Sequence, residues 1–269
     1  MRITAKTKIC MVIGDPIEHS FSPQMHNAGY KALHIDNQYV YIACRVSIHT
    51  IDSFIKGAKA TNIHGISCTM PHKIAVMPYL DEIDKVAKKI GAVNTIINND
   101  GKLVGYNTDW LGVLTPLEKL TSLQNKKVAL IGAGGAARAV AYAITNKGAK
   151  LLIFNRTIDK AKTLAEEFGG TAYPLNAAEI INNADIIINT TSVGLHDKKE
   201  TPLPQKYITK NHIIFDVIYG HETRLLKEAK KQGAQIIQGR EMLLYQGLAQ
   251  FKLYTGHDAP ETVMRKVLL

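Results

Sequence analysis

The sequence predicts an α/β fold with two domains, and three observations lead to this prediction. Short β-rich runs alternate with helical patterns along the whole chain of 269 residues, an order typical of mostly parallel sheets. A glycine-rich turn at 132–137 lies in mid-chain, so the long segment before it can form a domain of its own. After Gly239, two apolar-periodic segments have no strand to follow. We expect these two helices to return to the first domain.

The first half of the chain predicts an α/β domain whose sheet is mixed but mostly parallel. Two of its strands should pair across the turn at 99–101, which contains Gly101. The segment 110–120 looks helical and should connect the two domains. The expected strands are 8–14, 38–44, 63–69, 92–98 and 103–109, with helices at 23–34, 49–60 and 81–89. This domain is predicted to comprise residues 1–110 plus 240–269.

The second domain, predicted for residues 111–239, begins with a recognisable strand, turn and helix. An apolar run ending at Ile131 reads as a buried strand, and the glycine-rich turn then leads into an Ala-rich helix. This is the arrangement of a Rossmann-type dinucleotide-binding domain. Further strands are expected at 150–154, 185–189, 212–217 and 235–237.

Three positions of the turn have a specific role in binding a pyrophosphate. Gly132 allows the tight turn, Gly134 lets the phosphates approach the backbone, and the small Ala137 lets the helix pack on the strand. The helix N-terminus offers N–H donors to phosphate. The alternative is a plain strand-to-helix corner. The predicted pyrophosphate site consists of Gly132, Ala133, Gly134, Gly135, Ala136 and Ala137.

The residues after the second strand indicate which dinucleotide is bound. An NAD-binding protein would place Asp or Glu there, on the ribose hydroxyls, but this chain has Asn155, Arg156 and Thr157. An arginine suits a 2′-phosphate, so the sequence predicts NADP(H). Lys160, one helical turn later, adds positive charge to the same phosphate or faces water, and Arg156 taken alone also fits a solvated helix start.

Composition excludes several other classes of protein. The 33 basic and 23 acidic residues give a formal charge of +10, which favours anionic partners, but the lysines are dispersed and no nucleic-acid motif is present. The three cysteines read as reduced core thiols of a cytoplasmic protein. The ten histidines form no metal-binding pattern, and no segment is long and apolar enough for a membrane span or a signal peptide. We therefore expect no metal, no nucleic acid and no membrane partner.

Four motifs in the first half carry polar residues suited to a ligand site. Ser20 and Ser22 can hydrogen-bond a carboxylate, although Ser22 before a proline also fits a helix cap. Lys73, near Thr69, can supply an ammonium group to the same site, although a lysine at this place is also typical of a solvated helix start. The last two motifs place Asn94 and Asp109 near the ends of neighbouring strands, where α/β proteins collect ligand groups but where turn formers also occur.

Such a set of groups suits the interconversion of an alcohol and a ketone. Hydride transfer to a ketone leaves oxyanion character that must be protonated, and a lysine such as Lys73 can stabilise the charge and donate the proton. A carboxylate, here Asp109, can hold the lysine and hydrogen-bond a neighbouring hydroxyl. The cofactor carries the hydride.

The motifs HSFSP, TMPHK, GAVNT, GYNTD, GAGGAAR, NRT and GREMLLYQG together resemble the shikimate dehydrogenase family, in the family's order. The resemblance implies reversible NADPH-dependent reduction of 3-dehydroshikimate to shikimate, in the chorismate pathway to aromatic amino acids. It implies Lys73 and Asp109 as the catalytic pair. It further implies Ser20 and Ser22 on the substrate carboxylate with Tyr219 nearby, Thr69, Asn94 and Gln246 on the hydroxyls, and Gly239 and Met242 by the nicotinamide.

Three positions depart from what many members of the family carry. Lys160 replaces an arginine and so loses its bidentate fork, Glu241 replaces a glycine, and His72 replaces a phenylalanine. Two other functions stay open: a quinate or quinate/shikimate dehydrogenase, and a catalytically silent NADPH-binding regulator. We expect a monomer or a homodimer.

Overall fold

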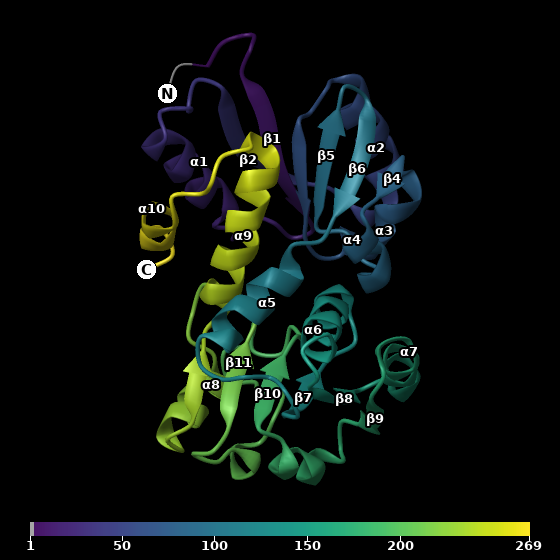
Figure 1. Cartoon of the computed structure of the whole chain (residues 1–269), viewed down its shortest axis with the longest axis vertical. Helices are drawn as coiled ribbons and strands as arrows, with labels where there is room; N and C mark the ends of the chain where they lie inside the picture. The colour runs from purple at the N-terminus through teal and green to yellow at the C-terminus, as the bar shows by residue number, and fades with distance from the viewer. Residues whose placement is uncertain (1–2) are drawn as a thin grey trace. The chain divides into compact units, whose positions relative to one another are not determined.

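The computed structural model describes residues 3–269, which divide into two compact units, each built on one six-stranded sheet (Figure 1). The first unit comprises the residues up to Thr108 together with Leu244–Leu269, and the second is Asp109–Leu243. The first boundary, predicted after residue 110, lies two residues earlier in the structure. The second, predicted after residue 239, lies four residues later.

The sheet of the first unit has the strand order β2-β1-β3-β5-β6-β4. Strand β1 pairs in parallel with β2 and β3, and β4 pairs in parallel with β6, whereas β5 is antiparallel to both of its neighbours. The prediction of a mixed, mostly parallel sheet is therefore confirmed. The strands are β1 (Lys8–Gly14), β2 (Tyr39–Arg45), β3 (Gly65–Cys68), β4 (Glu82–Ile83), β5 (Thr95–Asn99) and β6 (Lys102–Tyr106).

The C-terminal helices pack in the first unit, as the sequence predicts. In Figure 1, α9 and α10 lie beside α1 and the first two strands. Phe251, Tyr254 and Met264 are buried in one cluster with Cys10 and Val12 of β1. The helices are α1 (Ser22–Ala32), α2 (Ile51–Ala60), α3 (His72–Ala75), α4 (Lys85–Ile90), α9 (Gly239–Thr255) and α10 (Glu261–Lys266), with short 3-10 turns η1 (Ile48–Thr50) and η2 (Met77–Tyr79).

The sheet of the second unit is entirely parallel, with the order β12-β11-β10-β7-β8-β9 that a Rossmann-type domain requires. Its strands are β7 (Lys127–Ile131), β8 (Lys150–Asn155), β9 (Thr171–Pro174), β10 (Ile186–Asn189), β11 (Ile213–Asp216) and β12 (Gln235–Ile237). Its helices are α5 (Asp109–Glu118), α6 (Gly135–Thr145), α7 (Ile158–Phe168) and α8 (Arg224–Lys231), with 3-10 turns η3 (Ala178–Asn183) and η4 (Gln205–Tyr207).

Two element boundaries differ from those expected, because side-chain hydrogen bonds end one element early and start another late. The strand expected to run to residue 109 ends at Tyr106, since the side chain of Asn107 donates to Ala92 O at 2.9 Å and that of Asn94 accepts from Thr108 N at 2.8 Å. The helix expected at 81–89 begins only at Lys85, where the Asp84 carboxylate accepts from the N–H of Val86.

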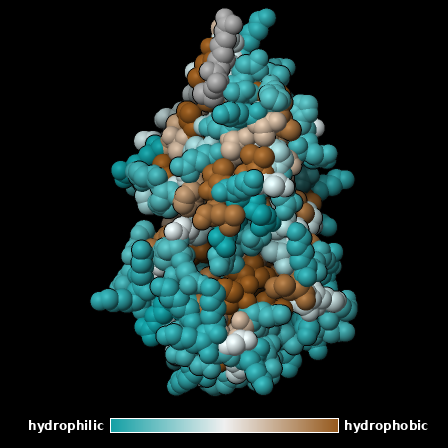
Figure 2. Space-filling view, turned by 90° about the vertical axis from the view of Figure 1, so that its left-hand side faces the viewer, coloured by the Kyte–Doolittle hydropathy of each residue, from teal (hydrophilic) through white to brown (hydrophobic). Residues whose placement is uncertain are grey.

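The surface and the interior show the usual separation of residue types. Hydrophilic residues cover most of the face seen in Figure 2. The apolar side chains form buried clusters on the faces of the two sheets. Among residues 3–269, no helix combines the length and hydrophobicity needed to cross a bilayer.

Candidate active site

The predicted substrate motifs lie next to strand ends that meet along one edge of the first sheet, the edge at which β1, β3 and β6 end. Ile13 of β1 pairs with Cys68 of β3, and Ser67 pairs with Thr95, the first residue of β5. Thr95 in turn pairs with Tyr106, the last residue of β6. Because β5 is antiparallel, its beginning lies beside the ends of β3 and β6. The segments after β1, β3 and β6 and the segment before β5 therefore meet at this edge.

The two serines follow β1 in the loop that leads into α1. Ser22 is the first residue of α1 and is 5% exposed, and its N–H donates to Ser20 Oγ at 3.3 Å. The residue before the helix is Phe21, so Ser22 is not the N-cap, and the hydroxyl that accepts from this end of the helix is that of Ser20. The alternative role of Ser22 as a helix cap is therefore wrong. Both serines remain candidates for ligand binding.

Lys73 is held at the same edge by backbone and side-chain contacts of its neighbours. Thr69 N–H donates to Ile13 O at 3.0 Å, and Lys73 O accepts from Val93 N–H at 2.7 Å. His72, which is fully buried, has its Nε2 2.8 Å from Val46 O. These contacts fix α3, and Lys73 itself is half-buried.

Asn94 lies at the centre of the gathered segments. It is 2% exposed, and its Nδ2 donates to Thr108 Oγ1 at 2.9 Å and, more weakly, to Gln246 Oε1 at 3.5 Å. Gln246, on α9, is 8% exposed. Asp109 follows Thr108 directly, opens α5 and is 3% exposed. A carboxylate in the first turn of a helix interacts favourably with the helix dipole.

The glycine-rich turn of the second unit has the backbone that a pyrophosphate site needs. Gly132 has φ +112°, a conformation that favours glycine, and its N–H donates to Phe154 O at 2.8 Å. A Cβ on Gly134 would meet nothing within 4 Å. Helix α6 starts at Gly135 without a side-chain cap, and Ala137 is fully buried in the core cluster. The open backbone and the helix N-terminus fit a dinucleotide.

The residues expected to bind the adenosine phosphate lie beside this turn, because β7 and β8 are parallel neighbours with Ile131 opposite Phe154. The Nδ2 of Asn155 donates to Thr157 O at 2.8 Å, which folds the segment into a tight turn. Arg156, Thr157 and Lys160 are exposed. The structure thus presents two cations and a hydroxyl, a donor set that fits a phosphate better than the diol of NAD.

A third group of predicted residues follows β11. Tyr219 is half-buried, and Met242 is 7% exposed. Gly239 packs so closely against the carbonyl groups of Val217 and Ile218 that a side chain there would collide with them.

The segment after β11 is fixed by Asp216, which the sequence analysis does not identify. Its buried carboxylate accepts from Thr223 Oγ1 at 2.6 Å, Asn189 Nδ2 at 3.0 Å and Ile218 N–H at 3.2 Å. Burial raises the pKa of Asp216, and these hydrogen bonds oppose the rise.

Two further residues around Asn94, Thr108 and Gln250, also escape the sequence analysis. Thr108 stands inside the GYNTD motif, next to Asp109. Gln250 follows Gln246 by four residues, and this spacing places both on one side of α9. The spacing is the signal that would have identified Gln250.

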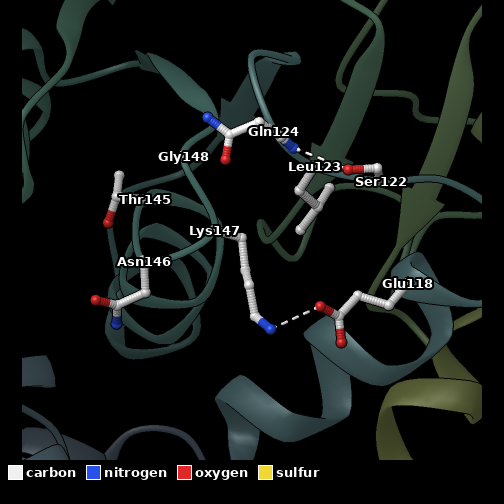
Figure 3. A pocket seen from close by; sticks show the side chains of 8 residues that line it. All are labelled: Glu118, Ser122, Leu123, Gln124, Thr145, Asn146, Lys147 and Gly148. Atoms are coloured by element: carbon white, nitrogen blue, oxygen red, sulfur yellow. Dashed lines mark hydrogen bonds and ion pairs between the residues drawn. The ribbon is translucent and has the colours of Figure 1, made fainter.

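A shallow polar hollow of about 530 Å³ lies in the second unit beside the segments that precede β7 and β8, whereas the glycine-rich turn follows β7 (Figure 3). Its residues come from the segment before β7 and from the end of α6. Lys147 Nζ and Glu118 Oε1, which point toward each other in Figure 3, form an ion pair at 2.8 Å. The lining residues are Glu118, Ser122, Leu123, Gln124, Thr145, Asn146, Lys147 and Gly148. It is separate from every predicted site residue. Within residues 3–269 no group of three metal-binding side chains occurs.

Comparison with known proteins gives three family models that match most of the chain. They are the shikimate dehydrogenase substrate binding domain at residues 12–96, shikimate / quinate 5-dehydrogenase at 116–217 and the shikimate 5′-dehydrogenase C-terminal domain at 239–269.

Full-length relatives agree with these models. A shikimate dehydrogenase (NADP(+)) of Methanosphaera stadtmanae is 43% identical and covers 99% of this chain and 98% of its own length. The crystal structure of shikimate dehydrogenase from Aquifex aeolicus superimposes with a TM-score of 0.93 at 40% identity, covering 99% of both chains. That of the Thermus thermophilus enzyme in complex with NADP(H) and shikimate has a TM-score of 0.90 at 35% identity, covering 97% of this chain and 98% of the other. The chain belongs to the shikimate dehydrogenase (NADP+) family.

Proposed function

We propose that this chain catalyses the reversible NADPH-dependent reduction of 3-dehydroshikimate to shikimate, with Lys73 and Asp109 as the catalytic pair. The observation that carries the proposal is the gathering of the substrate motifs at one edge of the first sheet, in a chain with a dinucleotide turn in its second unit. The route to aromatic amino acids is the pathway in which this reaction belongs.

The binding groups divide by the chemistry of the substrate. Ser20 and Ser22 donate hydroxyl hydrogen bonds to the substrate carboxylate, and Tyr219 is the third residue assigned to this group. Thr69, Asn94 and Gln246 bind the ring hydroxyls. The burial of Asn94 and Gln246 supports this role, because buried amides hydrogen-bond a matching polar ligand more strongly than exposed ones.

The reaction requires charge stabilisation and a proton at the carbonyl oxygen. NADPH, when bound, supplies the hydride. The Lys73 ammonium stabilises the developing oxyanion and donates the proton to it. The Asp109 carboxylate orients the ammonium and accepts a hydrogen bond from the neighbouring substrate hydroxyl. In the reverse direction Lys73 accepts the proton again.

The cofactor residues have separate tasks. Residues 132–137 hold the pyrophosphate, and Asn155, Arg156, Thr157 and Lys160 hold the adenosine phosphate. Gly239 and Met242 lie by the nicotinamide. The exposed cations and the open backbone at Gly134 support this assignment.

The location and the assembly are part of the same proposal. The cysteines at 10, 44 and 68 are all free thiols, which supports a location in the reducing cytoplasm. A monomer or a homodimer is expected, and analytical ultracentrifugation measures which of them forms.

The test is a spectrophotometric assay of shikimate-dependent reduction of NADP, with quinate and NAD as the competing substrate and cofactor. We expect turnover with shikimate and NADP, and turnover on quinate would favour a quinate/shikimate dehydrogenase. NADPH binding without any turnover would favour the silent regulator. Lys73→Ala should lower kcat by about 10² to 10⁴-fold with an intact fold, whereas Lys89→Ala, at an exposed lysine of α4, should not.

A further inference from the structure

A chain of buried hydrogen bonds crosses the first unit and ends on the side chain of Asn94. Tyr41 Oη donates to Ser67 Oγ at 2.5 Å, and Ser67 Oγ donates to Gln250 Oε1 at 3.0 Å. Gln250 Nε2 donates to Thr95 Oγ1 at 2.9 Å, and Thr95 Oγ1 donates to Asn94 Oδ1 at 2.8 Å. Each of these five residues is at most 4% exposed.

The direction of this chain is fixed by backbone groups. The backbone oxygen of Asn94, which can only accept, lies 3.2 Å from Gln250 Nε2. The amide of Gln250 therefore faces Asn94 with its NH₂ group and faces Ser67 with its oxygen. Because Nε2 also donates to Thr95 Oγ1, the single hydroxyl proton of Thr95 is directed to Asn94 Oδ1.

A second backbone group fixes the other side of Asn94. The N–H of Thr108, which can only donate, lies 2.8 Å from Asn94 Oδ1. Oδ1 thus accepts from Thr108 N and Thr95 Oγ1, and the NH₂ group of Asn94 faces Thr108 Oγ1 and Gln246 Oε1. A reversed amide would set NH₂ against two buried donors, which is strongly unfavourable.

We propose that Thr95 and Gln250 are positioning residues of the substrate site, which lock the amide of Asn94 with its NH₂ group toward Gln246. The NH₂ group of Asn94 then donates to the ligand, so the site selects a hydrogen-bond acceptor, such as the oxygen of a ligand hydroxyl, beside Asn94. The inference rests on the proposed function through the role of Asn94. It adds two residues that act on the substrate without touching it.

The test uses one substitution that removes the Thr95 hydroxyl at nearly constant volume and one that keeps the hydroxyl. Thr95→Val preserves the shape and leaves the contact between Gln250 and the Asn94 backbone, but removes one donor to Asn94 Oδ1. We expect the KM for shikimate and its dissociation constant to rise about three- to tenfold, the equivalent of one hydrogen bond. The KM for NADP should stay unchanged. Thr95→Ser, which keeps the hydroxyl, should restore the wild-type values.

A second variant reverses the direction of the chain. In Gln250→Glu the buried carboxyl group keeps a single proton, which it donates to Asn94 O, so it no longer donates to Thr95 and the Thr95 hydroxyl donates to it instead of to Asn94. The same selective rise for shikimate is expected, and this variant decides the matter if Thr95→Val does not fold. Tyr254→Phe is the matched control, because the Tyr254 hydroxyl bonds Ser67 at 2.7 Å in the same network but does not reach Asn94.

The inference is overturned if both Thr95→Val and Gln250→Glu bind shikimate like the wild type, or weaken NADP equally. It is also overturned if Tyr254→Phe produces the same rise. Wild-type protein that neither binds nor oxidises shikimate would instead reject the proposed function itself, so the two failures are distinguishable.

Discussion

The backbone of Gly132 lies directly against the side chain of Thr190. A Cβ on Gly132 would be 2.5 Å from Thr190 Oγ1, and that hydroxyl is held in place by donating to Ile131 O at 2.8 Å. Gly132 also has φ +112°. The turn between β7 and α6 therefore depends on glycine for two independent reasons, its conformation and its contact with Thr190, the residue after β10.

We predict that Gly132→Ala lowers the free energy of unfolding by about 2 kcal/mol, because an L-residue is strained at this φ and its methyl group displaces Thr190. Urea denaturation measures the change. A variant as stable as the wild type would show that the turn can rearrange.

Gly134→Ala should leave stability almost unchanged and weaken the binding of NADPH instead. Its φ of −97° suits any residue, and a Cβ there meets nothing within 4 Å. Stability should change by less than about 0.5 kcal/mol, as for an unstrained surface substitution. The methyl group would stand where the pyrophosphate approaches, so the affinity for NADPH, measured by fluorescence titration, should fall. An unchanged affinity would place the phosphates elsewhere.

Arg156→Ala should weaken NADPH far more than NADH. Loss of a charge-assisted hydrogen bond to a phosphate corresponds to about a tenfold to hundredfold rise in the dissociation constant. NADH has no 2′-phosphate and should bind as before. Lys162→Ala is the matched control, because Lys162 is exposed on the same helix as Lys160 but pairs with Asp159. Equal losses for both cofactors would contradict the assignment of Arg156.

Asp109→Asn should lower kcat by at least about 10²-fold, since an amide orients the Lys73 ammonium without a charge. Stability should also fall, because Asp109 is buried in the first turn of α5, where its carboxylate interacts favourably with the helix dipole. Steady-state kinetics and thermal unfolding measure the two effects. Asp258→Asn, at an exposed carboxylate paired with Lys252, should change neither.

The sequence predicted secondary structure best where a local residue pattern alone determines the element. The run ending at Ile131 and the turn after it predicted β7 and α6 correctly, because a buried parallel strand and a glycine turn are both local. Strand β4, Glu82–Ile83, was missed because two residues show no periodicity. Strand β9 was also missed, because it is a short edge strand that ends in Pro174, and a short segment with a proline reads as a loop.

The polar network of the first unit escaped prediction for a different reason. Ser67, Thr95 and Gln250 lie far apart in the sequence, and the pairing of β3 with β5 and the packing of α9 bring them together. Each of these residues taken alone reads as an ordinary strand or helix residue. Buried hydrogen bonds between distant segments leave no periodic signal.

His26, on α1, is a further member of the buried polar residues of this unit. Its ring is fully buried and stacks on Tyr41 with centroids 4.3 Å apart, and on Phe251 at 6.1 Å. Burial lowers the pKa of His26 to about 3. In the unfolded chain the imidazole titrates near its ordinary value of about 6.5.

Between pH 6.5 and about 3 the unfolded state therefore binds a proton at His26 that the native state does not bind. The contribution to stability is fully present above pH 6.5 and is lost as the pH falls, at up to about 1.4 kcal/mol per pH unit. We predict that His26→Phe, which keeps the stacking, reduces the slope of unfolding free energy against pH between 6 and 4, measured by urea denaturation. His257→Gln, at an exposed histidine, should keep the wild-type slope. Equal slopes in all three proteins would mean that His26 is protonated in the native state, since only a group that differs between the two states can contribute to the slope.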